Sequence, residues 1–355
     1  MFKPILLTCA ALLAGGTQFA TDYSADKAFK VEFQSTLSMK TTSMSMERDG
    51  EPVERPGGGG ANSSSQSRKA VFTDKIVAAK AGKASKLTRT FESLSGSSTF
   101  TMGEDETTRD LEPQLTGVTL SLERADNGDV TAKVADGKAP SDDACLAGHH
   151  MELALDAFLP EGEVADGASW EINKDVVKRA LALDMEKALY PRPAPTEGGD
   201  APRGGGGGGG GGGRGRGFGG MGGGDGRLLE IAAWESKATL TDEKVEKGGV
   251  ACRVIAIELK AKGDMPEPAP REGGPRRGQA LGLESESALF GSTYKIELEG
   301  KLYFSTADKR PVAFELEGSL NQDTDMEREG RDGGTMRIKS TREGTYKQTV
   351  SVSRP

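Results

Sequence analysis

The sequence predicts a mainly β protein with α+β elements: one large, curved antiparallel sheet or half-open barrel, with a small helical insert in the middle of the chain. Three observations predict this fold. Apolar and polar residues alternate with a period of two over several long segments, which is typical of antiparallel strands with one solvated face. Helical periodicity is confined to residues 141–190. Aromatic residues form only 5% of the 355-residue chain, which favours a thin aliphatic core over a thick helical bundle.

The first twenty residues, MFKPILLTCAALLAGGTQFA, have the composition of a secretory signal peptide: a cation, an apolar run and then small residues. Cleavage after Gly16 places small residues at the two recognised positions, and cleavage after Ala20 is the alternative. The apolar run is about half of the ~20 residues that span a bilayer, so we expect no transmembrane segment in the mature chain. We therefore expect residues 1–20 to be a signal peptide, and the protein to be exported, periplasmic or extracellular.

Alternation also defines the expected strands. In residues 294–304, YKIELEGKLYF, apolar residues face one side, and residues 312–320, VAFELEGSL, repeat the pattern after a turn. These two segments are expected to form a hairpin. A second hairpin is expected over residues 118–134, where Asn127-Gly128 suits a tight turn. Further strands are expected at Phe29–Met39, Ala70–Ala78, Leu87–Leu94, Glu230–Thr241, Val250–Lys262, Leu283–Phe290 and Met336–Val352.

Two helices are expected between the two blocks of strands. Ser141–Leu159 begins with acidic residues, carries an apolar stripe and ends before Pro160. Asn173–Tyr190 begins with a capping asparagine and ends before a proline. The strands on either side are expected to join in a single β-rich domain over residues 21–355.

Three tracts, at about residues 49–68, 191–227 and 264–280, are rich in glycine, proline and polar residues. They bury too little apolar area to offset the entropy of ordering, so we expect disordered insertions in the domain. Arg214, Arg216 and Phe218 in the second tract resemble an RNA-binding arginine-glycine cluster. The net charge of −8 argues against nucleic-acid binding, so the tract is interpreted as a flexible spacer.

Two cysteines remain after the leader, Cys145 and Cys252. They are a candidate disulfide because an oxidising compartment favours pairing. In the alternative, both thiols are unpaired and Cys252 packs between Val250 and Val254 on one strand face.

The two histidines, His149 and His150, are adjacent. On a helix, neighbouring side chains point about 100° apart, so both cannot face one metal ion, and no metal site is assigned. A metal-binding protein or enzyme at these histidines is one alternative. The sequence holds no G-x-S-x-G motif, and two histidines are few for a hydrolase. We therefore expect a protein that is not an enzyme and needs no cofactor.

The most distinctive segment is LPEGEVADGASW, residues 159–170. Leu159 and Pro160 end a helix, Asp166 and Gly167 form a turn, and Trp170 anchors the next element. The segment resembles the LP…V..G..W segment of secreted bacterial β-rich proteins. Their layout is similar to that of the Lol-type and LppX-type periplasmic carriers. The resemblance covers the layout of residues 28–352 and implies a bent, incompletely closed sheet that wraps helices and holds acyl chains.

These features favour an exported envelope protein that holds a lipid or another apolar ligand between sheet and helices. In a second interpretation the same side chains fill a closed core, and in a third the protein is a structural or interaction module whose glycine-rich tracts reach partners. The candidate ligand-lining residues are Leu153, Ala157, Ile296, Leu298, Phe304, Phe314 and Leu316.

Overall fold

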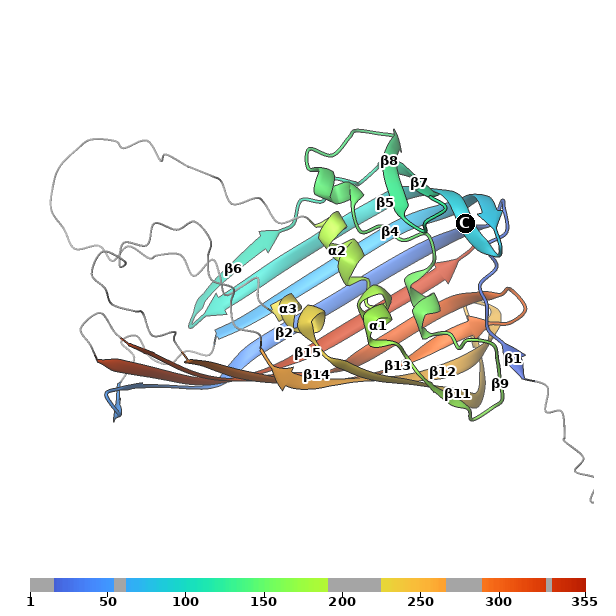
Figure 1. Cartoon of the computed structure of the whole chain (residues 1–355). Helices are drawn as coiled ribbons and strands as arrows, with labels where there is room; N and C mark the ends of the chain where they lie inside the picture. Colours follow the sequence, from blue (N-terminus) through green and yellow to red (C-terminus); the bar gives the residue numbers. More distant parts are fainter. Residues whose placement is uncertain (1–15, 54–61, 191–224, 266–288, 330–333) are drawn as a thin grey trace, which may run out of the picture.

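The computed structural model describes residues 16–53, 62–190, 225–265, 289–329 and 334–355. It is mostly β, with 64% of residues in strands, and one antiparallel sheet of 13 strands dominates the described part of the chain (Figure 1). The mainly β prediction is confirmed. In spatial order the main path of the sheet is β10 (Ser169–Glu171), β11 (Trp234–Lys247), β12 (Val250–Asp264), β13 (Leu289–Ser305), β14 (Arg310–Glu329), β15 (Thr335–Ser353), β2 (Ala28–Arg48), β4 (Asn62–Lys80), β5 (Lys83–Met102), β7 (Thr119–Arg124) and β8 (Val130–Asp136).

The strands before and after the helical insert belong to this one sheet. The last strand, β15, pairs with β2 near the start of the chain, from Ser353 opposite Lys30 to Met336 opposite Arg48. Two short strands lie off the main path: β3 (Glu51–Pro52) pairs with β2, and β6 (Asp105–Asp110) pairs with β5. The end strands β10 and β8 do not pair with each other, so the sheet formed by the described residues stays open.

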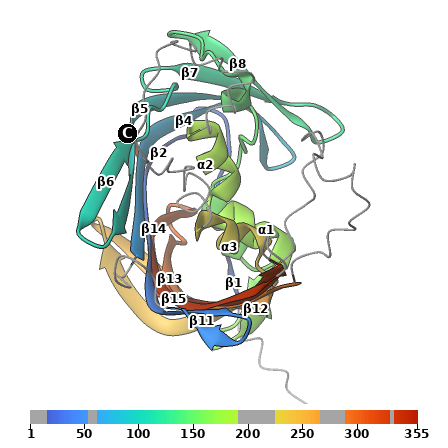
Figure 2. The same ribbon diagram turned by 90° about the vertical axis from the view of Figure 1, so that its left-hand side faces the viewer.

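The sheet curves around the helices, which lie inside its concave side (Figure 2). Glycines on adjacent strands permit the close approach that this curvature requires. A Cβ atom at Gly318 of β14 would lie 2.0 Å from the carbonyl oxygen of Glu297, and one at Gly300 of β13 would lie 2.3 Å from that of Glu315. Any larger residue at either position would push β13 and β14 apart.

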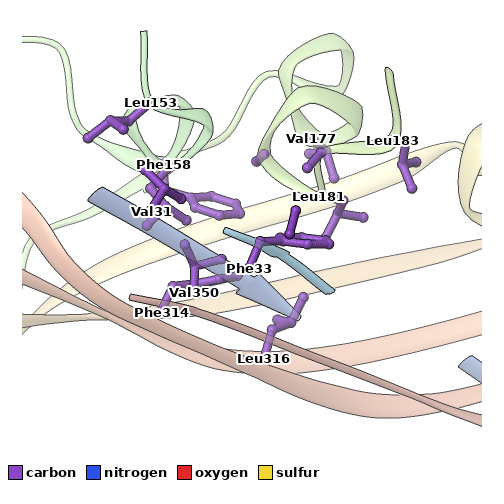
Figure 3. Close-up of a cluster of buried hydrophobic side chains, with 14 of the residues drawn as sticks. Val31, Phe33, Leu153, Phe158, Val177, Leu181, Leu183, Phe314, Leu316 and Val350 are labelled. Atoms are coloured by element: carbon purple, nitrogen blue, oxygen red, sulfur yellow. The ribbon is translucent and has the colours of Figure 1, made fainter. Parts of the chain in front are cut away.

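Alternating side chains of the sheet form the main core on the concave face. Figure 3 shows Phe33 and Val350 from the sheet facing Leu181 from the helical insert. Phe158 of the insert packs against Phe314 of β14, with ring centroids 5.1 Å apart. The predicted hairpins β13–β14 and β7–β8 both form.

The insert is less helical than predicted. Asn173 caps α1 (Lys174–Ala180) by accepting a hydrogen bond from the Asp175 amide, as expected. A positive φ at Ala182 then separates α1 from α2 (Leu183–Leu189), so the second expected helix is two short ones.

The prediction of a helix over Ser141–Leu159 is wrong. This segment forms two 3₁₀ turns, η1 (Asp143–Leu146) and η2 (Ala154–Phe158), joined by non-helical chain. Gly148 has a φ of +71°, and a Cβ atom there would lie 3.1 Å from the Asp184 carbonyl oxygen. A right-handed helix requires negative φ, so the positive φ at Gly148, close to α2, prevents a continuous helix through this segment.

The expected insertions also need correction at their ends. Residues 62–68 form the start of β4, because their main chain pairs with β2 and β5 although their side chains are polar. Residues 225–227 belong to α3 (Asp225–Ile231), so the strand expected from Glu230 begins at Trp234. Residues 54–61, 191–224 and 266–280 of the three tracts, and residues 283–288 of one expected strand, lie outside the described residues.

The folded body includes residues that were expected to belong to the leader. Strand β1 (Thr17–Gln18) pairs with β9 (Glu163–Val164). Phe19 is 3% exposed and lies edge-on to Phe304, with ring centroids 5.3 Å apart. Residues 17–19 thus contact the β-rich domain that was expected to begin at residue 21. Within the described residues, the helices are all too short or too polar to cross a membrane.

Candidate functional site

A small cavity of about 50 Å³ lies between the concave face of the sheet and the helical insert. Its walls combine apolar side chains with charged and amide side chains. The sheet contributes Val31, Phe33, Phe72, Val350 and Val352, together with the polar residues Asp74, Arg89 and Gln348. The insert contributes Leu153, Ala154, Leu155, Ala180, Ala182 and Met185, together with the polar residues His150, Glu152, Arg179 and Asp184.

A buried ion pair forms part of the sheet wall. Asp74 on β4 lies directly opposite Arg89 on β5, and the two residues are 2% and 3% exposed. Arg89 Nε and Nη2 donate to the two carboxylate oxygens of Asp74, each at 2.7 Å. Nη2 also donates to the His150 carbonyl oxygen at 2.9 Å, and the guanidinium lies 4.7 Å from the centroid of the Phe72 ring. The pair therefore joins the sheet to the insert.

A second ionic cluster centres on Glu152. Its carboxylate accepts a hydrogen bond from Arg124 Nη2 and lies 3.5 Å from Arg179 Nη2. Burial alone would raise the pKa of Glu152, but the hydrogen bond from Arg124 and the charges of both arginines lower it overall. Glu152 is therefore an anion held between two cations.

The two histidines have different surroundings. His149 is 5% exposed; its Nε2 donates to the Cys145 carbonyl oxygen at 2.8 Å, and its Nδ1 faces Arg89 Nη1 at 3.5 Å. Burial and the charge of Arg89 lower the pKa of His149 to about 4. His150 lies 3.8 Å from the Asp184 carboxylate, and burial lowers its pKa too.

These contacts disfavour a metal site at His149, because both of its ring nitrogens face protein groups. Among the described residues, no group of three or more histidine, cysteine or acidic side chains is placed to bind a metal ion.

A buried carboxyl group ties the insert to the N-terminal segment. Asp156 of η2 accepts hydrogen bonds from Thr21 Oγ1 at 2.6 Å and from the Tyr23 hydroxyl at 2.5 Å. The Tyr23 oxygen in turn accepts a hydrogen bond from the Leu153 amide at 2.6 Å. Complete burial raises the pKa of Asp156 to about 6. The residues just after β1 therefore contact η2 beside the cavity.

The candidate ligand-lining residues divide into two groups. Leu153 lines the cavity. The five strand residues of β13 and β14 are 0–1% exposed and fill the core instead, and Ala157 packs at the edge of that core. This part of the prediction is wrong because the cavity lies over β2, β4, β5 and β15. The misplaced strand residues are Ile296, Leu298, Phe304, Phe314 and Leu316.

The candidate disulfide is absent. Cys145 and Cys252 are both free and buried. Cys145 belongs to the main core on the concave side, whereas Cys252 packs with Val254 in a second small cluster on the other face of the sheet. The sheet separates the two thiols, so the alternative of unpaired cysteines is the correct one.

Three polar wall residues have buried nitrogens with no hydrogen-bond partner among the described residues: Gln348 Nε2, Arg179 Nε and His150 Nε2. Gln348, Arg89 and Asp74 were not among the site residues predicted from the sequence. A signal was present, because each interrupts an apolar alternation: Gln348 follows Tyr346 and precedes Val350 with the same spacing of two.

A second concave region, an open groove of about 890 Å³, lies beside β10 and β11 at the edge of the sheet. Both tryptophans of the chain line it, Trp170 and Trp234. Trp170 Nε1 donates to the Phe158 carbonyl oxygen at 3.1 Å, which agrees with its expected anchoring role.

Fold and site together define an open, curved antiparallel sheet whose concave face is covered by short helices, with a small amphipathic cavity between the two layers. Comparison of the chain with protein-family models and with curated proteins finds no match.

Proposed function

We propose that the protein is an exported, non-enzymatic carrier that holds an acyl chain between the concave face of the sheet and the helical insert. The cavity between these two layers carries the proposal, because both layers supply apolar side chains to its walls. Residues 159–170 resemble a segment of secreted bacterial β-rich proteins, whose layout is similar to that of the Lol-type and LppX-type periplasmic carriers. The acidic groups Asp74 and Glu152 are engaged by arginines, which favours a binding role over acid–base catalysis.

The size of the cavity implies that the insert moves when a ligand enters. Ligand sites usually enclose about 300 to 1,000 Å³, several times the volume of about 50 Å³ seen here. The sheet is held by long ladders of main-chain hydrogen bonds, whereas α1 and α2 have seven residues each. Helices this short depend on packing for their stability. We therefore expect Leu155 and Met185 of the insert to be displaced, and the sheet to stay in place.

Export is the second part of the proposal. Of the two cleavage positions, the fold favours the one after Gly16. Cleavage after Ala20 would remove β1 and Phe19, which packs against Phe304 in the core. Cleavage after Gly16 keeps both features, so we propose that the mature chain starts at Thr17.

Native mass spectrometry of protein purified without detergent from its native compartment tests both parts. We expect a polypeptide that starts at Thr17 and carries an additional mass equal to an acyl-chain compound. A ligand-free mass after gentle purification would argue against the carrier. A chain that still starts at Met1 would argue against export, and a start at Thr21 would show that β1 is dispensable.

A second candidate function is protein–protein interaction at the groove beside β10 and β11. The size of the groove and its two tryptophans favour it, since tryptophan is enriched at interfaces. Native mass spectrometry also distinguishes the two candidate functions, because an interaction module is expected to give the ligand-free mass.

A further inference from the structure

Gln348 occupies an unusual position on the concave face of β15. Its neighbours on that face, Tyr346 and Val350, are buried, and Gln348 itself is 1% exposed. The Tyr346 hydroxyl donates to Gln348 Oε1 at 2.9 Å, which leaves the Nε2 donor without a partner among the described residues. A buried donor without an acceptor costs stability, so such a group in a folded protein requires an explanation.

Two further buried nitrogens belong to the same cavity wall. Arg179 Nε is buried without a hydrogen-bond partner, although Nη2 of the same side chain lies 3.5 Å from Glu152. His150 Nε2 is buried as well, and its 3.8 Å separation from the Asp184 carboxylate is too long for a hydrogen bond. Gln348 and Arg179 thus offer unpaired donors to one small space, and His150 Nε2 adds a third in the tautomer that carries its proton on Nε2.

The size and charge of this space indicate its occupant. A cavity volume of about 50 Å³ is several times the roughly 10 to 15 Å³ that one water molecule needs, so the space admits a group larger than a single water molecule. Arginine favours a charged acceptor over a neutral one. The acidic residues nearby are Asp74, Glu152 and Asp184. The first two are held by arginines, and the Asp184 side chain is about half exposed.

From this arrangement, and resting on the proposed carrier function, we propose that the ligand is an acyl chain that ends in a free carboxylate. The carboxylate oxygens accept hydrogen bonds from Gln348 Nε2, Arg179 Nε and His150 Nε2. The chain extends along the apolar wall made by Val31 and Phe33 on the sheet and displaces Leu155 and Met185 on the insert.

Titration calorimetry on the delipidated full chain tests this proposal with two probes, laurate and methyl laurate. The probes share a chain and differ in the charge of the head group. A charged hydrogen bond favours laurate, and we expect laurate to bind about tenfold more tightly than its ester. Gln348→Leu and Arg179→Met should each reduce this preference to about twofold or less, with ester binding unchanged.

Arg253→Met is the matched control. Arg253 Nε is also buried without a hydrogen-bond partner among the described residues, but Arg253 does not line the cavity, so its loss should leave the preference intact. Arg179 is partly exposed, so Arg179→Met tests the proposal even if Gln348→Leu fails to fold. Equal binding of both probes, or a preference that survives the Gln348 and Arg179 substitutions, would overturn the carboxylate proposal and leave the carrier function standing. Binding of neither probe would overturn both.

Discussion

Arg89→Met is expected to lower the free energy of unfolding by about 3 to 5 kcal/mol, because it leaves the Asp74 carboxylate buried without its cation. Methionine keeps most of the length and apolar contact of the arginine stem, so the loss reports on the charge. The substitution also removes the hydrogen bond to the His150 carbonyl oxygen. Urea unfolding followed by far-ultraviolet circular dichroism measures the change.

Two control variants show whether the loss of stability comes from the unpaired buried charge. The double variant Asp74→Leu/Arg89→Met removes both charges and should recover much of the lost stability, since a buried pair can be replaced by apolar residues. Lys86→Met breaks the exposed ion pair with Glu123, and it should cost less than about 1 kcal/mol. A loss below 1 kcal/mol for Arg89→Met itself would show that the Asp74–Arg89 pair does not hold the sheet and the insert together.

Asp156→Asn and His149→Gln are expected to change the pH dependence of stability in opposite directions. The pKa of Asp156 is raised from 3.8 to about 6, so its contribution is complete below pH 3.8 and is lost as the pH rises through 6. The pKa of His149 is lowered from 6.5 to about 4, so its contribution is present above pH 6.5 and is lost as the pH falls towards 4. Each shift of about two units corresponds to roughly 3 kcal/mol.

The pH dependences of the two contributions therefore nearly cancel in the wild-type protein between pH 4 and 6. Asp156→Asn should gain stability relative to wild type as the pH rises over this range, and His149→Gln should lose it. Urea unfolding at intervals of half a pH unit gives both differences, and groups unaffected by the substitutions cancel in them. Stability curves parallel to that of wild type would contradict the burial of these two groups.

A strand could be predicted from the sequence only where one of its faces is buried in the core. Alternation identified β2, β12 and β13 where they cover the core. It did not predict residues 62–68 of β4, because those side chains are polar and the strand continues only through main-chain pairing with β2 and β5. The ends of strands set by pairing carry no apolar signal, so they were missed.

The site was harder to predict than the fold. Asp74 interrupts the alternation of Phe72 and Ile76, and Arg89 interrupts that of Leu87 and Phe91, so both polar positions are visible in the sequence. Their pairing is not visible, because the register of β4 and β5 shifts at three irregular positions. A bulge moves one strand along the other, and only the folded sheet shows which residues meet.

The location of a bound acyl chain tests the central claim most directly. A laurate analogue with a photoreactive diazirine near its methyl end is bound to the delipidated protein and irradiated. The labelled residues are then located by peptide mass spectrometry. We predict labels on residues 153–155 and 180–185 of the insert and on the concave face of β2 and β15, and their loss when excess laurate is present. Labels confined to the other face of the sheet, around Val254 and Tyr303, or labels that excess laurate does not reduce, would contradict a ligand site between sheet and helices.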